Sequence, residues 1–426
     1  MSTPTTPGLS TEGQARNGPL PQGLRVAILC LALGQTVTWA GVYYIFAALL
    51  PRWELTEGWP KTGLAAAFAG AIAVSALAAP LAGRLIDRGH GPLLLTGSTL
   101  LGAVSIGLLP LAASTGAGLA LFFPLWLCAG LAMAGALYEP CFALITRCLD
   151  TGARRAITTV TLIAGFAGAL SFPTAHLISE ASSWQAATTT AALATALIAA
   201  PLAWIGANRL ETARPSPAQA ASPDPSLDHS TQSRRWSDPV FAPLALGFAT
   251  IAIGHGGIIA HILPLLSERG VAEGTAVLAA SCIGPMQVFG RLAMRLLETR
   301  TTAHAVTRLG FVAVIAAALS ILVASLAPGL TLYLLPVFVV LQGMGYGVMS
   351  VMRPVRTREL LGQRDFGAIS GALALPYLMA AALAPFLGAL LWFVGGYDLV
   401  LLFTAAALAA GLMLYLRASA LGRGSI

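Results

Sequence analysis

Long apolar runs separated by short polar segments fill almost the whole chain. Most runs hold about 20 residues, the length that an α-helix needs to cross about 30 Å of hydrocarbon. The pattern therefore predicts twelve membrane-spanning helices, at residues 24–50, 62–84, 92–113, 117–146, 156–179, 185–206, 240–265, 273–297, 304–326, 330–352, 366–393 and 397–417.

A polar segment rich in Pro and Ser divides these helices into two groups of six. We expect a disordered tail at 1–23, a six-helix bundle at 24–206, a linker at 207–239, a second six-helix bundle at 240–417 and a tail at 418–426. The fold class is then an all-α polytopic membrane protein.

Composition agrees with this class. The chain is 57% apolar and only 10% charged, and its mean hydropathy is +0.79, whereas soluble domains carry about 25% charged residues. Five cysteines lie in or beside the apolar runs, without CxxC or Cys/His spacing, so neither a disulfide framework nor a metal site is indicated. No nucleophile–base spacing and no ATP-binding P-loop appear. We expect no enzyme activity and no cofactor.

The basic residues predict the orientation of the helices. With both termini in the cytoplasm, only Arg52, Lys61 and Arg269 of the 24 basic residues lie on the outer side. The opposite orientation reverses that ratio and violates the positive-inside rule. The net charge of +7 is therefore a topology signal and does not indicate nucleic-acid binding.

The two groups of six helices also repeat in sequence. "LLPRWELTEG" at 49–58 aligns with "LLSERGVAEG" at 265–274. A similar offset places Ile157 on Ile369 and Pro173 on Pro385. Matches in constant order indicate a duplication, which gives two pseudo-symmetric bundles related as parallel repeats.

The end of the second predicted helix carries a motif. "GRLIDRGHGP", from Gly83, resembles the cytoplasmic loop signature of the major facilitator superfamily (MFS), G-x-L-x-D-R, although the residues after Arg88 depart from the family's Gly and two basic residues. The resemblance implies the MFS fold and a latch of Gly83, Asp87 and Arg88. In that latch, Asp87 lies against the positive N-terminus of the eleventh helix near Gly367. The alternative is a solvated charged turn.

Resemblance to particular branches of the family is weaker. The fourth helix has Trp126 where drug/proton antiporters carry arginine, which disfavours multidrug efflux. "GVYYIF" at 41–46 and Gln287-x-x-x-Arg291 resemble the monocarboxylate porter and oxalate–formate antiporter branch. In that comparison Gln287 replaces an aspartate, and Ala48 replaces a lysine used in coupling.

Arg291 is the candidate anchor for a substrate. It lies about 9 Å inside the end of the eighth helix, with Gln287 one turn earlier on the same face. A guanidinium binds a carboxylate through two parallel hydrogen bonds, so an organic anion is the expected substrate. Alternatively, Arg291 belongs to the loop or extends its side chain to the membrane interface.

Glu139 is an acid within the fourth predicted helix, and ionisable residues at this depth are functional candidates. Burial would let it exchange a proton near neutral pH, which suits a coupling residue. A second interpretation pairs it with Arg353 across the cavity, and a third places it at the lipid surface.

Two further sets of polar residues lie inside the predicted helices. His255 lies in "GHGG", where glycines would loosen the seventh helix, and is a candidate functional residue. His261, in the same helix, is a weaker candidate. The alternative for each is a hydrogen-bonded structural histidine. The second set shares one face of the first predicted helix and contains Gln35, Thr38, Trp39 and Tyr43. This face suits either a ligand pocket or packing between helices.

The sequence therefore predicts a secondary active transporter of a small organic anion, working by alternating access, with H⁺ as a candidate coupling ion. The alternative is a proton-driven efflux pump for neutral or cationic compounds. We expect a monomeric protein in the lipid bilayer of a bacterial inner membrane, with a small-molecule substrate and no nucleic-acid partner.

Overall fold

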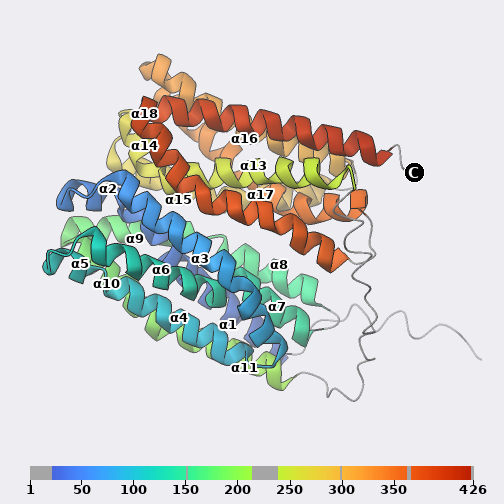
Figure 1. Ribbon diagram of the computed structural model, residues 1–426, viewed down its shortest axis with the longest axis horizontal. Coiled ribbons are helices and arrows are strands. Elements are labelled where there is room, and N and C mark those ends of the chain that lie inside the picture. The colour runs from blue at the N-terminus through green and yellow to red at the C-terminus, as the bar shows by residue number, and fades with distance from the viewer. Residues whose placement is uncertain (1–21, 150–151, 214–237, 298–299, 362–365, 424–426) are drawn as a thin grey trace, which may run out of the picture.

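The structure is a computed structural model that describes residues 22–149, 152–213, 238–297, 300–361 and 366–423. In these ranges the chain forms helices and connecting turns, without strands. Figure 1 shows the helices as two groups that lie side by side.

The first group holds the helices up to residue 212. Several predicted spans are formed by two or three helical pieces placed end to end. The pieces are α1 (Gln22–Thr38), η2 (Trp39–Tyr44), α2 (Ile45–Glu57), α3 (Lys61–Asp87), α4 (Gly91–Gly107), α5 (Pro110–Ser114), α6 (Leu119–Ala136), α7 (Tyr138–Cys148), α8 (Ala153–Ala164), α9 (Ala167–Ala181), α10 (Trp184–Ala194), η3 (Thr195–Ala199) and α11 (Ala200–Thr212).

The second group follows the linker region, most of which lies outside the described residues. It contains α13 (Phe241–Ala260), α14 (Ile262–Glu268), α15 (Glu273–Leu297), α16 (Ala303–Leu326), η5 (Pro328–Leu330), α17 (Thr331–Leu361) and α18 (Phe366–Arg423). Within α18 the backbone leaves the helical conformation at Gly395 and Gly396, and Gly396 has φ of +65°. An L side chain rarely adopts that value, so glycine allows the chain to reverse here.

The described residues contain 11 helical segments long and apolar enough to cross a membrane. The last, Ala372–Gly422, contains the reversal at Gly395 and Gly396 and crosses twice. This agrees with the twelve predicted spans. Some helices extend beyond the predicted bounds: residues 207–212 and 418–423 are helical, although we expected a linker and a tail there. Apolar length predicts only the part of a helix inside the hydrocarbon.

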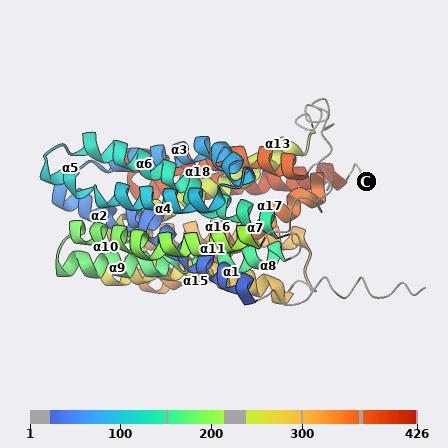
Figure 2. The same cartoon turned by 90° about the horizontal axis from the view of Figure 1, so that it is seen from below.

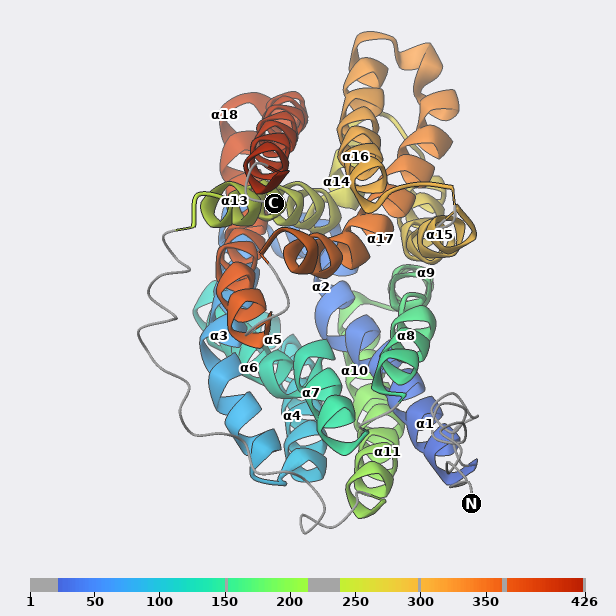
Figure 3. The same ribbon diagram turned by 90° about the vertical axis from the view of Figure 1, so that its right-hand side faces the viewer.

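Both the start of α1 and the end of α18 lie at the same end of the molecule, which we call the terminal end (Figures 1 and 3). The other end, which carries α2, α5 and α14, we call the opposite end. Figure 2 shows the first bundle from below, with its helices running between these two ends.

Buried apolar side chains are distributed differently at the two ends. The largest core cluster runs across both bundles and includes Leu50 of α2 and Leu266 of α14, at the opposite end. Toward the terminal end the cores separate: one cluster, with Leu31, belongs to the first bundle, and another, with Tyr415, to the second. The bundles are therefore joined by apolar packing mainly at the opposite end.

Two pairs of helices pack against each other across the boundary between the bundles: α3 against α18, and α9 against α15. Gly284 of α15 approaches the backbone of Gly165, between α8 and α9, so closely that a Cβ at Gly284 would collide with the Gly165 carbonyl. Small residues at such crossings permit the close packing that holds helices together in lipid.

Candidate functional site

The fourth span breaks between α6 and α7, at Leu137. Pro140 has no backbone N–H, so the carbonyl of Ala136 lacks its usual helical donor four residues on. The Nε2 atom of Gln35 donates a hydrogen bond to this carbonyl over 2.6 Å. Gln35 is 4% exposed, and its Nε2 atom satisfies the carbonyl at the break. Its Oε1 atom has no hydrogen-bond partner.

Beside this break, the first span contains a widened π-helical turn, η2. Such turns are rare and concentrate at functional sites. The ring of Trp39 lies 4.9 Å from that of Tyr43 and 4.7 Å from that of Tyr138 in α7. The Nε1 atom of Trp39 is buried without a hydrogen-bond partner. The hydroxyl of Thr38 donates a hydrogen bond to the Gly34 carbonyl of its own helix.

The second bundle presents a polar chain of its own. His255 of α13 lies 3.2 Å from the Gln342 amide and stacks on Tyr346 with centroids 3.3 Å apart. The Tyr346 hydroxyl is 3.0 Å from that of Tyr377. The guanidinium of Arg353 lies over the Tyr377 ring at 4.0 Å. His255 is thus placed in a network that joins α13, α17 and α18.

These two sets of aromatic side chains face each other. Tyr43 of the first bundle interacts electrostatically with Tyr377 of the second, and Tyr346 with both Tyr43 and Tyr44. All four of these tyrosine residues are half-buried. The tyrosines therefore line one region shared by the bundles, at the depth of the breaks in the first and fourth spans.

Arg291 lies in the same region. Its Nε atom donates to the Gly347 carbonyl at 3.3 Å, and its Nη1 to the Thr161 carbonyl of the first bundle at 3.4 Å. It also interacts electrostatically with Tyr44 and Tyr138. Arg291 has no carboxylate partner among the described residues. Its neighbour Gln287 is 7% exposed, and its backbone packs against Gly347.

Glu139 is exposed and stands in the first turn of α7. It interacts electrostatically with Tyr43 and Tyr138, which places its carboxylate beside the tyrosine region. The ion pair with Arg353, one of the three interpretations of the sequence, is not formed in this conformation. Arg353 lies over Tyr377 instead, and its Nη1 atom is buried without a partner.

His261 is hydrogen-bonded within the second bundle. It lies between α13 and α14, where Pro264 interrupts the seventh span. Its Nε2 atom lies 2.8 Å from the Pro385 carbonyl, and its Nδ1 atom 3.3 Å from the Tyr397 hydroxyl. Because a carbonyl only accepts, Nε2 carries the proton and Nδ1 accepts from the tyrosine. Both ring nitrogens are satisfied.

The residues of the expected latch lie at the terminal end. Asp87 and Arg88 are exposed and form no ion pair within the described part of the chain. A Cβ at Gly83 would meet no described atom within 4 Å. The predicted neighbour near Gly367 belongs to a stretch whose side chains are outside the described set. Within the described part of the chain, Gly83 is therefore not a point of close helix approach in this conformation.

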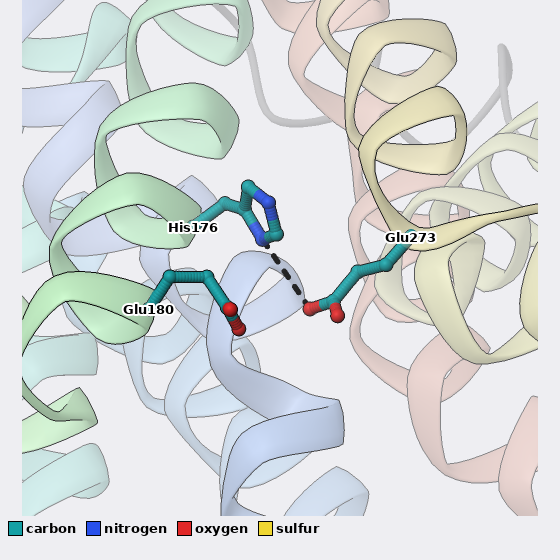
Figure 4. Close-up of side chains that lie close together, drawn as sticks. All are labelled: His176, Glu180 and Glu273. Carbon is teal, nitrogen blue, oxygen red and sulfur yellow. Dashed lines mark ion pairs between the residues drawn. The ribbon is translucent and has the colours of Figure 1, made fainter.

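Sequence reasoning missed a cluster of charged residues at the opposite end. Arg52 of α2 pairs with Glu180 of α9 and, at 2.7 Å, with Glu273 of α15. His176 lies 3.3 Å from Glu273 (Figure 4). Among the described residues, the one arginine–carboxylate pair between the two bundles joins Arg52 to Glu273, and the His176 imidazole lies beside the same carboxylate.

A second contact between the bundles lies nearby. The ammonium group of Lys61 stands 3.5 Å from the centroid of Trp392. Arg52 and Lys61 are two of the three basic residues that the sequence predicted on the outer side. Their isolation from the other basic residues was the signal that could have located these contacts.

Comparison with known proteins agrees with this architecture. The family model of the Major Facilitator Superfamily matches residues 31–352. A crystal structure of a bacterial homologue of the human lysosomal transporter Spinster, inward-facing and occupied, is 16% identical, with a TM-score of 0.65 over 95% of this chain and 97% of that one. Its inward-facing, unoccupied form gives 15% identity and a TM-score of 0.64 over the same shares. No curated protein sequence matches significantly. The chain belongs to the Major Facilitator Superfamily and is a membrane transporter of small solutes.

Proposed function

We propose that this protein moves a small organic anion across a bacterial inner membrane by alternating access, as a monomer with both termini in the cytoplasm. The orientation rests on the basic residues, which gather at the terminal end. Under this orientation the opposite end faces outward.

The observation that carries the proposal is the environment of Arg291. Its guanidinium is held by two long hydrogen bonds to backbone carbonyls, one from each bundle, and no carboxylate neutralises it among the described residues. A permanently charged group at this depth is costly without a partner. A substrate carboxylate supplies that partner through two parallel hydrogen bonds.

Five further residues complete the proposed substrate site. Trp39 offers an unpaired indole N–H, and Gln35 an unpaired carbonyl oxygen. Tyr43 and His255 border the region from opposite bundles, and Gln287 lies one turn from Arg291. An anion bound here contacts both bundles, so its binding responds to their relative movement.

The distribution of contacts supports an inward-facing conformation. The opposite end is closed by the shared apolar core and by the contacts of Glu273 with Arg52 and His176, whereas the cores separate toward the terminal end. Closure of the terminal end would bring Asp87 toward the start of α18, and we propose that Gly83, Asp87 and Arg88 form the latch of that closed state.

We propose Glu139 as the coupling residue. Its carboxylate is exposed, borders the tyrosine region and forms no ion pair with a described residue. A proton on Glu139 would change the net charge beside the substrate by one unit, and an anion would bind more favourably to the protonated form. Arg353 remains available as an ion partner for Glu139 in another conformation.

The proposal is tested by stabilisation of purified protein with matched acids and amides, lactate against lactamide and benzoate against benzamide. Carboxylates should raise the unfolding temperature of the wild type and of the control Arg308→Ala, whose arginine is exposed on α16. They should not stabilise Arg291→Ala. Equal stabilisation of all three proteins would show that Arg291 is not the anchor.

A second candidate function is proton-driven efflux of neutral or cationic compounds. The unpaired carboxylate of Glu139 beside several tyrosine rings favours it, because such a group attracts cations. Uptake and efflux of labelled cations by vesicles containing wild type or Glu139→Gln at several pH values separates the two functions. Cation transport lost in Glu139→Gln but retained in Arg291→Ala would favour this alternative.

A further inference from the structure

Three potential metal ligands meet at the opposite end, outside the proposed substrate site. His176 and Glu180 are four residues apart on α9 and share one face of the helix. Glu273 is the first residue of α15, in the other bundle. One ligand atom of each residue lies within 4.8 Å of the others. Figure 4 shows the three side chains converging across the boundary between the bundles.

We propose that these residues form a binding site for a zinc-class divalent metal ion that bridges the two bundles. Imidazole nitrogen and carboxylate oxygen bind Zn²⁺ at about 2.0–2.2 Å, with three protein ligands and one position left for water in open sites. Ligand atoms 4.8 Å apart or less reach these distances through small side-chain rotations, because His176 and Glu273 already touch at 3.3 Å.

Arg52 is the cation that occupies this position in the absence of metal. It pairs with both Glu180 and Glu273. Two carboxylates and one guanidinium leave a net negative charge, so the cluster still favours a further cation. Glu180 and Glu273 are 52% and 59% exposed, and Arg52 is 24% exposed. A metal ion can therefore reach the carboxylates from solvent, and the arginine can turn away into water.

The bound metal would hold the opposite end closed. Its ligands come from α9 and α15, which belong to different bundles, and they separate when that end opens. A ligand that binds only one conformation shifts the population toward it. Zinc-class ions would therefore stabilise the closed opposite end, while Mg²⁺, which prefers several water ligands and oxygen donors, would bind poorly.

The experiment measures Zn²⁺ binding by calorimetry and Co²⁺ binding by visible absorption, using the full-length protein in detergent without a purification tag. The wild type should bind one ion and gain thermal stability on binding. His176→Ala and Glu273→Gln should each weaken binding by about tenfold or more and lose the gain. His90→Ala, which removes an exposed histidine at the terminal end, should bind like the wild type.

Arg52→Gln provides a test in the opposite direction. If Arg52 competes with the metal, its removal strengthens Zn²⁺ binding, whereas a merely structural disturbance weakens it. Glu180→Gln replaces any ligand variant that does not fold. The proposal is overturned if the wild type binds no Zn²⁺, if His176→Ala and Glu273→Gln bind it unchanged, or if Arg52→Gln binds it more weakly.

Discussion

Gly290 determines how closely α15 packs against α17, directly beside Arg291. A Cβ added at this position would lie 2.5 Å from the carbonyl oxygen of Met344 and 2.7 Å from its Cα. Both atoms belong to the backbone of α17, so no side-chain rotation relieves the collision. Gly290→Ala must therefore move one helix away from the other.

The size of this movement follows from the distances. Ordinary Cβ contacts begin at 3.4 Å, so the helices must separate by about 0.7–0.9 Å in a close-packed interior. Overpacking of this kind costs about 1–3 kcal/mol. Arg291 donates to the Gly347 carbonyl of α17 at 3.3 Å, so the same movement also draws the backbones that carry these two groups apart.

The assay is unfolding of the purified protein in detergent, followed by tryptophan fluorescence. Gly274→Ala is the matched control, because Gly274 lies on the same helix and a Cβ there would meet nothing within 4 Å. Gly274→Ala should be neutral or slightly stabilising, since alanine favours helices over glycine. A Gly290→Ala variant as stable as the control would refute the proposed close approach of α15 and α17.

Three other predictions concern single contacts. Glu273→Gln removes the acceptor that Arg52 and His176 contact across the bundles and should speed amide exchange at the start of α15, whereas Glu180→Gln removes a contact within the first bundle and should leave α15 unchanged; equal effects on α15 would contradict the assignment. Pro140→Ala supplies an N–H to the Ala136 carbonyl and should slow amide exchange around Leu137, and unchanged exchange would mean that Pro140 does not cause the break. Arg147→Gln leaves the half-buried Glu211 without its cation and should cost about 1–3 kcal/mol in unfolding, with the exposed Arg155→Gln as a neutral control.

The membrane spans were predictable because their signal is one-dimensional. A helix in lipid needs enough apolar residues to cross the hydrocarbon, and each polar break marks a return to water. Even the reversal at Gly395 and Gly396, which joins two helices into α18, was visible as a break between predicted spans. The helical ends at 207–212 and 418–423 were missed, since polar residues outside the bilayer do not distinguish a helix from a linker.

The rotation of each helix about its axis was not predictable from the pattern. In water, an apolar stripe shows which face is buried, but helices in lipid are apolar on nearly all sides. The sequence therefore could not indicate that Tyr346 and Tyr377 approach Tyr43 and Tyr44 from the other bundle. For the same reason, it could not decide whether Arg353 pairs with Glu139; in the structure the arginine lies over Tyr377.

The acid at position 139 is best understood together with the proline that follows it. Pro140 removes one backbone donor, the fourth span breaks at Leu137, and Gln35 satisfies the released carbonyl of Ala136. A new helix then starts at Tyr138, which puts Glu139 in its first turn. Unpaired N–H groups at a helix N-terminus stabilise a negative charge. The first turn of α7 therefore gives the Glu139 carboxylate a favourable position without the arginine that one interpretation of the sequence paired with it.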